Sequence, residues 1–338
     1  HIGLRRVLNW LKLPIKPLYG IYFNLRLKKV QVSQMKAQKK VAKKEKIRVV
    51  FFIIHESVWK YDGVYRLMLH DKRFEPIVVV CPYTTFGEEV MLREMDQAYL
   101  SFKQKGYNVI KCLCENGHWL DVKKELQPDM VFFTNPYFLT KKEYYIKNFL
   151  DSMSFYIPYG FMITNRPWMQ YNQFMHNFVF KIFHESIFHQ KQAQKYSSNK
   201  GVNSVVTGYP GLDQFLESNK DDKNNPNNVW KSKDKKIKRI IWAPHHTIES
   251  EENPFCYSNF LYYYDFFLSI ADKYKDSITV SFKPHPILKA KLNKHPEWGE
   301  ERTKGYYQEW ENRPNCQLNE GDYVNLFNES DAMIHDSG

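Results

Sequence analysis

Short apolar runs alternate with amphipathic segments along most of this chain. Residues 49–54 (VVFFII) form a continuous apolar run bounded by charged residues, which is typical of a strand buried on both faces of a parallel sheet. Further strands are predicted at 76–81, 107–112, the end of 125–133, 155–158, 186–189 and 205–207, with helices at 62–69 and 87–105. This alternation predicts a parallel sheet with helices on both faces.

A polar segment interrupts the alternation. Residues 217–238 are rich in Asn, Asp and Lys and are expected to form an exposed linker. A second alternating part follows, with strands at 239–243, 278–282 and 332–334, helices at 259–274 and 323–328, and an irregular stretch through Pro314. The pattern therefore predicts two doubly wound α/β domains, 47–216 and 239–338, with ligands bound at the carboxyl ends of the strands.

Residues 1–46 have a different character. Apolar residues recur at helical spacing before and after Pro14 and Pro17, and a lysine-rich run follows. These apolar residues are Leu4, Val7, Leu8, Leu11, Leu18, Ile21, Tyr22 and Leu25. An amphipathic helix beside a basic run predicts an arm that contacts the anionic inner face of a membrane. Packing of this helix on the body of the protein is the alternative.

The distribution of charge argues against a nucleic-acid-binding domain. The formal net charge is +12, but residues 1–48 hold 14 basic side chains and only one acidic side chain, Glu45. The remaining chain is nearly neutral, whereas a duplex-binding domain usually spreads its basic residues over the folded surface. A hydrophobic content of 43% also excludes a disordered chain.

The five cysteines show neither a paired framework nor the spacing of a zinc site. We therefore expect free thiols, a reducing compartment, and no metal or cofactor. The sequence has no apolar stretch of the ~18 residues that a spanning helix needs and no secretion signal, so a cytoplasmic protein at the membrane surface is predicted. Because the chain begins with His1 and stops just after a predicted buried strand, we expect the natural protein to continue further.

Four motifs follow predicted strands. They are Thr207-Gly-Tyr-Pro-Gly-Leu-Asp213, Trp242-Ala-Pro-His-His-Thr247, Phe282-Lys-Pro-His-Pro286 and Ser330-Asp-Ala-Met-Ile-His-Asp-Ser-Gly338. Together they resemble the CDP-glycerol glycerophosphotransferase family of teichoic-acid and capsule polymerases, over roughly residues 48–338. The resemblance implies a GT-B fold, in which two Rossmann-like domains face a cleft. It also implies transfer of a polyol phosphate from a CDP-linked donor to a lipid-linked or saccharide acceptor, without a metal.

The residues after these strands suit a diphosphate donor, which needs cations and hydrogen-bond donors at its phosphates. Lys283 supplies positive charge, and His285 can donate a hydrogen bond or carry a proton. Pro284 and Pro286 hold that loop extended. The resemblance assigns His285 to catalysis. Donor phosphate or nucleotide binding is expected at Pro210, His245, His246, Lys283, Asp336, Ser337 and Gly338.

The chain departs from the family at one position. The family has a His-Gly pair at a strand end of its first domain, thought to act as base on the acceptor hydroxyl, but here Tyr159 precedes Gly160. Tyrosine, with an unperturbed pKa near ~10, is a poor base at neutral pH. His55, at the end of the first strand, is therefore the alternative candidate for this catalytic role.

Two other functions fit the same sequence. The chain could be a GT-B glycosyltransferase that uses a nucleotide sugar for surface polysaccharide synthesis. It could also be a non-catalytic binding subunit of a capsule assembly, since the first-domain histidine is missing.

Overall fold

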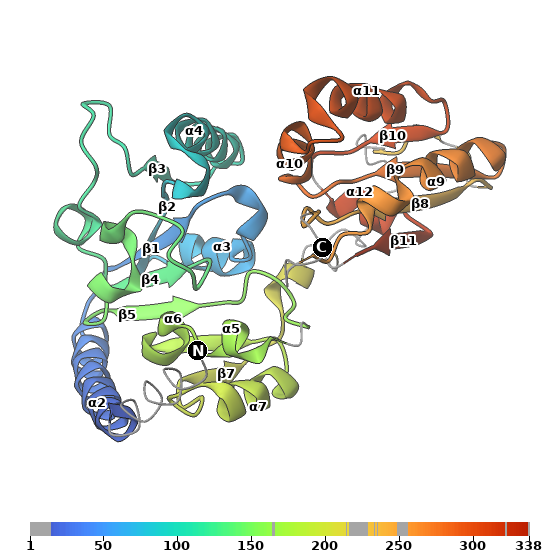
Figure 1. Ribbon diagram of the computed structural model, residues 1–338. Helices are drawn as coiled ribbons and strands as arrows, with labels where there is room; N and C mark the ends of the chain where they lie inside the picture. The colour runs from blue at the N-terminus through green and yellow to red at the C-terminus, as the bar shows by residue number, and fades with distance from the viewer. Residues whose placement is uncertain are drawn as a thin grey trace. The chain divides into compact units, whose positions relative to one another are not determined.

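The structure is a computed structural model that describes residues 15–163, 166–213, 215, 229–232, 234, 236–248, 256–321 and 323–336. The chain divides into two compact units, His1–Asp213 (unit 1) and Gln214–Gly338 (unit 2). Each unit is built around its own sheet (Figure 1).

Unit 1 contains a seven-stranded sheet in the order β3-β2-β1-β4-β5-β6-β7, and its paired strands are parallel. The strands are β1 Ile47–Ile53, β2 Phe74–Val80, β3 Val109–Lys111, β4 Met130–Phe133, β5 Met153–Tyr156, β6 Lys181–His184 and β7 Ser204–Val206. The α-helices are α2 Ile15–Val41, α3 Asp62–His70, α4 Glu88–Gln104, α5 Pro167–Tyr171, α6 Phe174–Phe178 and α7 Ile187–Tyr196. As the sequence predicts, β1 is buried on both faces, and Phe51 stacks on Phe132 with ring centroids 4.7 Å apart.

The prediction of a strand at 186–189 is wrong. These residues begin α7, and the strand is β6, which ends at His184. Ser186 is the extended residue before the helix (φ −158°, ψ 171°). The apolar pair Ile187 and Phe188, which suggested a buried strand, is exposed on the first turn of the helix.

Unit 2 contains a four-stranded parallel sheet in the order β10-β9-β8-β11. Its strands are β8 Lys238–Ala243, β9 Ile278–Phe282, β10 Cys316–Leu318 and β11 Ala332–His335, and its helices are α9 Phe260–Lys273, α10 Leu288–Lys294, α11 Gly299–Asn312 and α12 Val324–Asn328. Aromatic residues fill its core, where Trp242 stacks on Phe260 and Phe267 at centroid distances of 5.7 and 4.4 Å.

Two expectations for unit 2 are wrong. The stretch through Pro314, expected to be irregular, contains α10 and α11, and β10 follows it. The sequence of α11 is mostly polar, but Thr303, Tyr306, Tyr307 and Trp310 are buried at helical spacing. The strand β11, expected to be buried, has all four residues exposed, and it pairs with β8 at one edge of the sheet.

Helix α2 packs on unit 1, which was the alternative to membrane contact (Figure 1). Gln34 donates a hydrogen bond from Nε2 to the carbonyl of Phe178 at 2.8 Å, and Val30 and Val41 are buried. Pro17 lies in the first turn, where a helix tolerates proline. The predicted apolar positions Leu4, Val7, Leu8 and Leu11 lie outside the described residues. Within the described part of the chain, no helix is long and apolar enough to cross a membrane.

Candidate functional site

Both sheets reverse their strand order next to the first strand. In unit 1 the reversal lies between β1 and β4, and in unit 2 it lies between β8 and β11. In open parallel sheets, ligands bind at the carboxyl ends of strands at such a reversal. We therefore describe the residues that follow these strands, beginning with unit 2.

The carboxyl edge of the sheet in unit 2 is held by backbone hydrogen bonds that continue past the strands. The N–H of Lys283 donates to the carbonyl of Trp242 at 2.8 Å, and the N–H of His285 donates to that of Pro244 at 3.1 Å. On the other side of β9, the N–H of Asn319 donates to Phe282 at 2.9 Å. The loops that carry the candidate residues therefore begin from a fixed backbone.

Three imidazoles meet at this edge. The ring centroid of His285 lies 5.2 Å from that of His245 and 4.3 Å from that of His246, and the latter two rings are 4.3 Å apart. All three side chains are half-buried. The structure thus brings together the predicted histidines of two different motifs, after β8 and after β9.

Backbone N–H groups face Nδ1 in two of the three imidazoles. Nδ1 of His285 accepts the N–H of Ile287 at 3.2 Å, and Nδ1 of His245 faces the N–H of Thr247 at 3.3 Å. An accepting ring nitrogen has no proton, so the neutral rings are assigned their proton on Nε2. His245 and His285 can therefore donate Nε2–H hydrogen bonds to an anion.

Asp336 holds the β11 side of the same edge. Its Oδ2 accepts the backbone N–H of His245 at 3.0 Å and the hydroxyl of Ser258 at 3.2 Å, and its Oδ1 accepts Nδ2 of Asn259 at 3.3 Å. With these contacts Asp336 positions the loop that carries His245. Ser337 and Gly338, predicted to contact phosphate, lie outside the described residues.

Lys283 does not reach towards Asp336. Its Nζ donates to Oδ1 of Asn319 at 3.1 Å and to the carbonyl of Gly321 at 2.9 Å, and both residues follow β10. Since β10 and β11 are the two edges of this sheet, the Lys283 ammonium and the Asp336 carboxylate flank the histidines from opposite sides. Asn319, Ser258 and Asn259 were not singled out in the sequence, because amides and hydroxyls in loops carry no distinctive pattern.

The histidine cluster is also the group that could hold a metal ion among the described residues. His245, His246 and His285 each offer a nitrogen, and these atoms lie within 4.8 Å of one another. Coordination through Nε2 would require the proton to move to Nδ1, which accepts backbone N–H groups in His245 and His285.

In unit 1, His55 follows β1 at the strand-order reversal. Its Nδ1 lies 2.7 Å from the hydroxyl of Ser57. Burial, with a smaller contribution from Lys60, lowers the pKa of His55 to about 4. The imidazole is therefore neutral at pH 7, as a proton acceptor must be.

Tyr159 and Pro210 lie after β5 and β7 in the same unit. Burial raises the pKa of Tyr159, although a hydrogen bond with Tyr137 opposes that shift. Tyr209 donates its hydroxyl to the carbonyl of Tyr159 at 3.3 Å, and Pro210 begins a turn of 3-10 helix, Pro210–Leu212. The raised pKa leaves even less of Tyr159 deprotonated at neutral pH than of an ordinary tyrosine.

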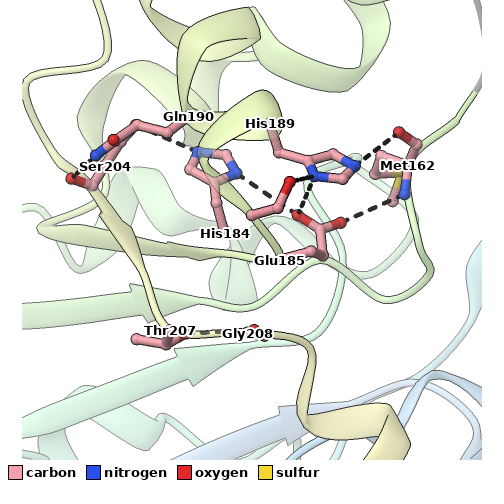
Figure 2. A network of polar contacts seen from close by, with 9 residues as sticks. Met162, His184, Glu185, His189, Gln190, Ser204, Thr207 and Gly208 are labelled. Carbon is pink, nitrogen blue, oxygen red and sulfur yellow. Dashed lines mark hydrogen bonds and ion pairs between the residues drawn. The ribbon is translucent and has the colours of Figure 1, made fainter.

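A buried carboxylate after β6 was missed in the sequence. Figure 2 shows Glu185 between His184 and His189, with its Oε2 3.8 and 3.9 Å from their Nδ1 atoms. Its Oε1 accepts the backbone N–H of Met162 at 3.3 Å, and Nε2 of His189 lies 3.1 Å from the carbonyl of the same residue. Glu185 and His189 thus hold the segment after Tyr159 by both backbone polar groups of one residue, Met162. The sequence holds one signal of this cluster: Glu185 directly follows His184 and precedes His189 by four residues, inside a mostly apolar run.

Comparisons with known proteins bear on the fold. No protein-family profile and no curated protein sequence matches this chain. Among solved structures, a variant of the wall teichoic acid polymerase TagF soaked with CDPG is 12% identical, with a TM-score of 0.50, over 98% of this chain and 75% of that one. At this identity the likeness shows the fold alone.

Two further solved structures are similar with lower TM-scores. UDP-GlcNAc 2-epimerase from Neisseria meningitidis bound to UDP-GlcNAc is 16% identical over 87% of this chain and 78% of that chain, with a TM-score of 0.48. Anabaena Alr3699/HepE in complex with UDP and glucose is 10% identical over 85% and 73%, with a TM-score of 0.43. The predicted α/β fold of GT-B type, with two Rossmann-like units, is confirmed by the topology and by the polymerase.

Proposed function

We propose that this chain is a GT-B transferase that binds the diphosphate of a nucleotide-activated donor at the carboxyl edge of unit 2. The observation that carries the proposal is the cluster of His245, His246 and His285 beside the strand-order reversal. Hydrogen-bond donors fixed on a rigid backbone stabilise phosphate charge without having to reorganise during the reaction. The Lys283 ammonium adds positive charge on the β10 side.

The donor that we favour is a CDP-linked polyol such as CDP-glycerol. Support comes from the motif Lys283-Pro284-His285-Pro286 and the Asp336-Ser337 ending, which resemble those of teichoic-acid and capsule polymerases. The fold shared with a wall teichoic acid polymerase agrees with this choice. The acceptor would be a lipid-linked or saccharide hydroxyl.

In the proposed reaction, the oxygen of the acceptor hydroxyl attacks the phosphorus next to the polyol. A new P–O bond forms, the bond to the bridging oxygen breaks, and CMP leaves with that oxygen. Nε2–H groups of His245 and His285 would donate to the phosphate oxygens as charge moves towards CMP. Phosphoryl transfer relies mainly on positioning and electrostatics, so this small set of residues is sufficient.

The proton of the attacking hydroxyl needs an acceptor, and His55 suits this role better than Tyr159. The lowered pKa of His55 keeps its ring neutral, whereas the raised pKa of Tyr159 keeps its phenol protonated. An acceptor with a pKa near 4 is weak, so it suits a transition state in which little negative charge has built up on the attacking oxygen.

Donor binding can be tested by measuring the thermal stability of the protein with a panel of CDP-glycerol, CDP, UDP-sugars and GDP-sugars. We expect selective stabilisation by CDP compounds and at least tenfold weaker binding in His285→Ala. His295→Ala is the matched control, because Nδ1 of His295 also accepts the N–H two residues on, from Glu297 at 3.3 Å. The control should bind the donor as the unchanged protein does.

Three outcomes would change the assignment. Selective stabilisation by UDP- or GDP-sugars would make the protein a glycosyltransferase with a sugar donor. Donor binding without transfer to any glycerol- or saccharide-ended acceptor would indicate a binding subunit. Loss of donor binding on adding EDTA would show that the three histidines act through a metal.

A further inference from the structure

Aromatic side chains follow several strands at the carboxyl edge of unit 1. Tyr137 follows β4, Tyr159 and Phe161 follow β5, and Tyr209 follows β7. The ring centroids of Tyr137 and Tyr159 lie 6.4 Å apart, and those of Phe161 and Tyr209 lie 5.9 Å apart. The hydroxyl of Tyr209 donates to the carbonyl of Tyr159 at 3.3 Å, which joins the two pairs. We call these four connected residues the aromatic row.

The aromatic row is partly open to solvent. Phe161 is 50% exposed, and the three tyrosines are half-buried. A single exposed aromatic ring is ordinary on a protein surface. A connected set of four at the edge where parallel sheets bind ligands is not, because ligand sites combine aromatic rings with a few polar groups. The phenol hydroxyls are the polar groups here.

Buried polar groups fix the position of Phe161. The next residue, Met162, donates its N–H to Glu185 at 3.3 Å, and its carbonyl lies 3.1 Å from Nε2 of His189 (Figure 2). The ring of Phe161 also meets the imidazole of His189 edge-on, at a centroid distance of 4.9 Å and an angle of 86°. Both Glu185 and His189 are buried. A ring held in this way loses little conformational freedom when a ligand stacks on it.

The segments that carry the aromatic row are electrically neutral. Residues 135–138, 157–163 and 207–212 contain no charged side chain. Burial raises the pKa of Tyr137 and of Tyr159, so both phenols keep their protons at neutral pH. A chain of phosphates would need cations along its path, which these segments do not supply. The row therefore suits a neutral ligand that has both apolar faces and hydroxyl groups.

The row begins two strands away from the strand that precedes His55. In the strand order β1-β4-β5-β6-β7, neighbouring strands lie ~4.8 Å apart. Tyr159 thus follows a strand ~10 Å from β1, and Tyr209 follows a strand ~20 Å from it. This length exceeds that of one sugar ring and can be spanned by a short chain of linked rings.

We propose that the aromatic row binds the sugar rings of a neutral saccharide acceptor, an inference that rests on the proposed transferase function. The C–H groups on the face of a sugar ring pack on Phe161 and Tyr209, because the rings present a negative face to such weakly positive groups. The phenols of Tyr137 and Tyr159 exchange hydrogen bonds with sugar hydroxyls. The acceptor is therefore a saccharide end rather than a growing polyol phosphate chain.

The inference can be tested with the intact chain and without any donor, by NMR titration with cellobiose, chitobiose, maltotriose and a glycerol phosphate trimer. We expect at least one of the three sugars to bind about tenfold more tightly than the trimer, because the row is neutral. Phe161→Ala should weaken sugar binding about tenfold or more, because it removes a ring that is already held in place. Phe161→Tyr keeps the ring and should bind the sugar nearly as the unchanged protein does.

Phe188→Ala is the matched control. Phe188 is 61% exposed and also meets the ring of His189 edge-on, at 5.5 Å, but it lies on α7 outside the row. This variant should bind the sugar normally. The inference is overturned if Phe188→Ala loses as much binding as Phe161→Ala, if none of the three sugars binds, or if the trimer binds more tightly.

These outcomes are separate from those for the donor. A protein that is stabilised by CDP-glycerol but binds no sugar would keep the proposed function and lose this inference. A protein that binds a sugar through Phe161 but is not stabilised by any CDP compound would keep the saccharide site and lose the proposed donor.

Discussion

At the scale of residues, unit 1 buries three histidines, and two of them, His184 and His189, lie close to the carboxylate of Glu185. His176, His184 and His189 are 2–3% exposed, and Glu185 is 7% exposed. Burial, with a smaller contribution from His184, lowers the pKa of His176 to about 3. Its Nδ1 accepts the backbone N–H of Gln173 at 3.0 Å, so the neutral ring has a structural role.

His176 should make unit 1 sensitive to acid. Above pH 6.5 the ring is neutral in the folded and in the unfolded state. Below pH 6.5 the ring takes up a proton in the unfolded chain, whereas in the folded protein it stays neutral down to about pH 3. Stability therefore falls as pH falls, by about 2 kcal/mol from this group at pH 5. We expect His176→Asn, whose Oδ1 can replace Nδ1 as acceptor, to flatten this dependence in urea unfolding between pH 7 and 5.

The exposed His70→Asn is the control for that experiment and should keep the acid sensitivity of the unchanged protein. The free energy of unfolding of His176→Asn should still fall somewhat as the pH falls, because the pKa of His55 is lowered as well. An unchanged slope would show that protonation of His176 does not control the acid stability of unit 1.

Glu185 should matter for the stability of unit 1 through the backbone of Met162. Removing the acceptor in Glu185→Ala leaves the N–H of Met162 unpaired, at a cost of about 1–3 kcal/mol. Glu185→Gln keeps an acceptor oxygen and should cost less, whereas the exposed Glu115→Ala should cost little. Urea unfolding measures all three, and equal losses in the Gln and Ala variants would mean that the negative charge is what counts.

The sequence allowed some of these residues to be predicted but not others. The motifs placed His245, His246 and His285 after parallel strands, and the topology brings them together because neighbouring parallel strands end at one edge. Glu185 was missed, because the backbone N–H that its Oε1 accepts belongs to Met162, 23 residues earlier in the chain. The direction of Lys283 could not be foreseen either, since its partners Asn319 and Gly321 follow a strand that was not predicted.

At the scale of elements, the turn between α7 and β7 shows how local geometry constrains sequence. Gly201 has φ +62°, and a Cβ there would lie 3.0 Å from the backbone N of Gln194. The turn is tied to α6 by buried amides, with Asn203 donating from Nδ2 to the carbonyls of His176 and Val179 at 3.0 and 2.8 Å. The turn has little freedom to move away from an added side chain.

Gly201→Ala should therefore destabilise unit 1 by about 1–3 kcal/mol, because it combines a left-handed backbone with a close contact. Gly20→Ala is the contrasting variant, because Gly20 lies inside α2 with no atom within 4 Å of its added Cβ. It should stabilise the helix by up to about 1 kcal/mol. Chemical unfolding measures whether the free energy of unfolding falls in Gly201→Ala and rises in Gly20→Ala. A stable Gly201→Ala would mean that the turn can rearrange.

Elements were predicted best where burial is complete. The runs of β1 and β2 are apolar because both faces of the central strands are covered, so composition alone identified them. Helix α11 was missed, because its buried side is made of tyrosine, tryptophan and threonine rather than aliphatic residues. The start of α7 was misread, because Ile187 and Phe188 are apolar yet exposed.

At the scale of the whole molecule, the two units have separate cores. The core of unit 1 centres on β1, with Phe51 and Phe132, and the core of unit 2 centres on Trp242, Phe282 and Trp310. A ligand bound by the unit 2 histidines alone stabilises that core and leaves the other unaffected. Two units of this size also make separate unfolding transitions a reasonable expectation.

Calorimetry with and without CDP-glycerol should therefore show two unfolding transitions. The Tm of one rises by several degrees with the ligand, and the Tm of the other is unchanged. At a ligand concentration of about 100 times Kd, the stabilisation is about 2.7 kcal/mol. His285→Ala, with at least tenfold weaker binding, should reduce this stabilisation to about half or less, and His295→Ala should preserve it. If both transitions moved together, the ligand would have to contact both units or the units would unfold as one.

The carboxyl edge of unit 2 has a consequence for how such a site can evolve. Main-chain hydrogen bonds from Lys283, His285 and Asn319 hold the first residues of its loops, so the path of these residues does not depend on the imidazoles. Exchange of an imidazole for another group would alter what is recognised while leaving the scaffold in place. Selection can then change ligand preference by single substitutions, without passing through forms that fail to fold.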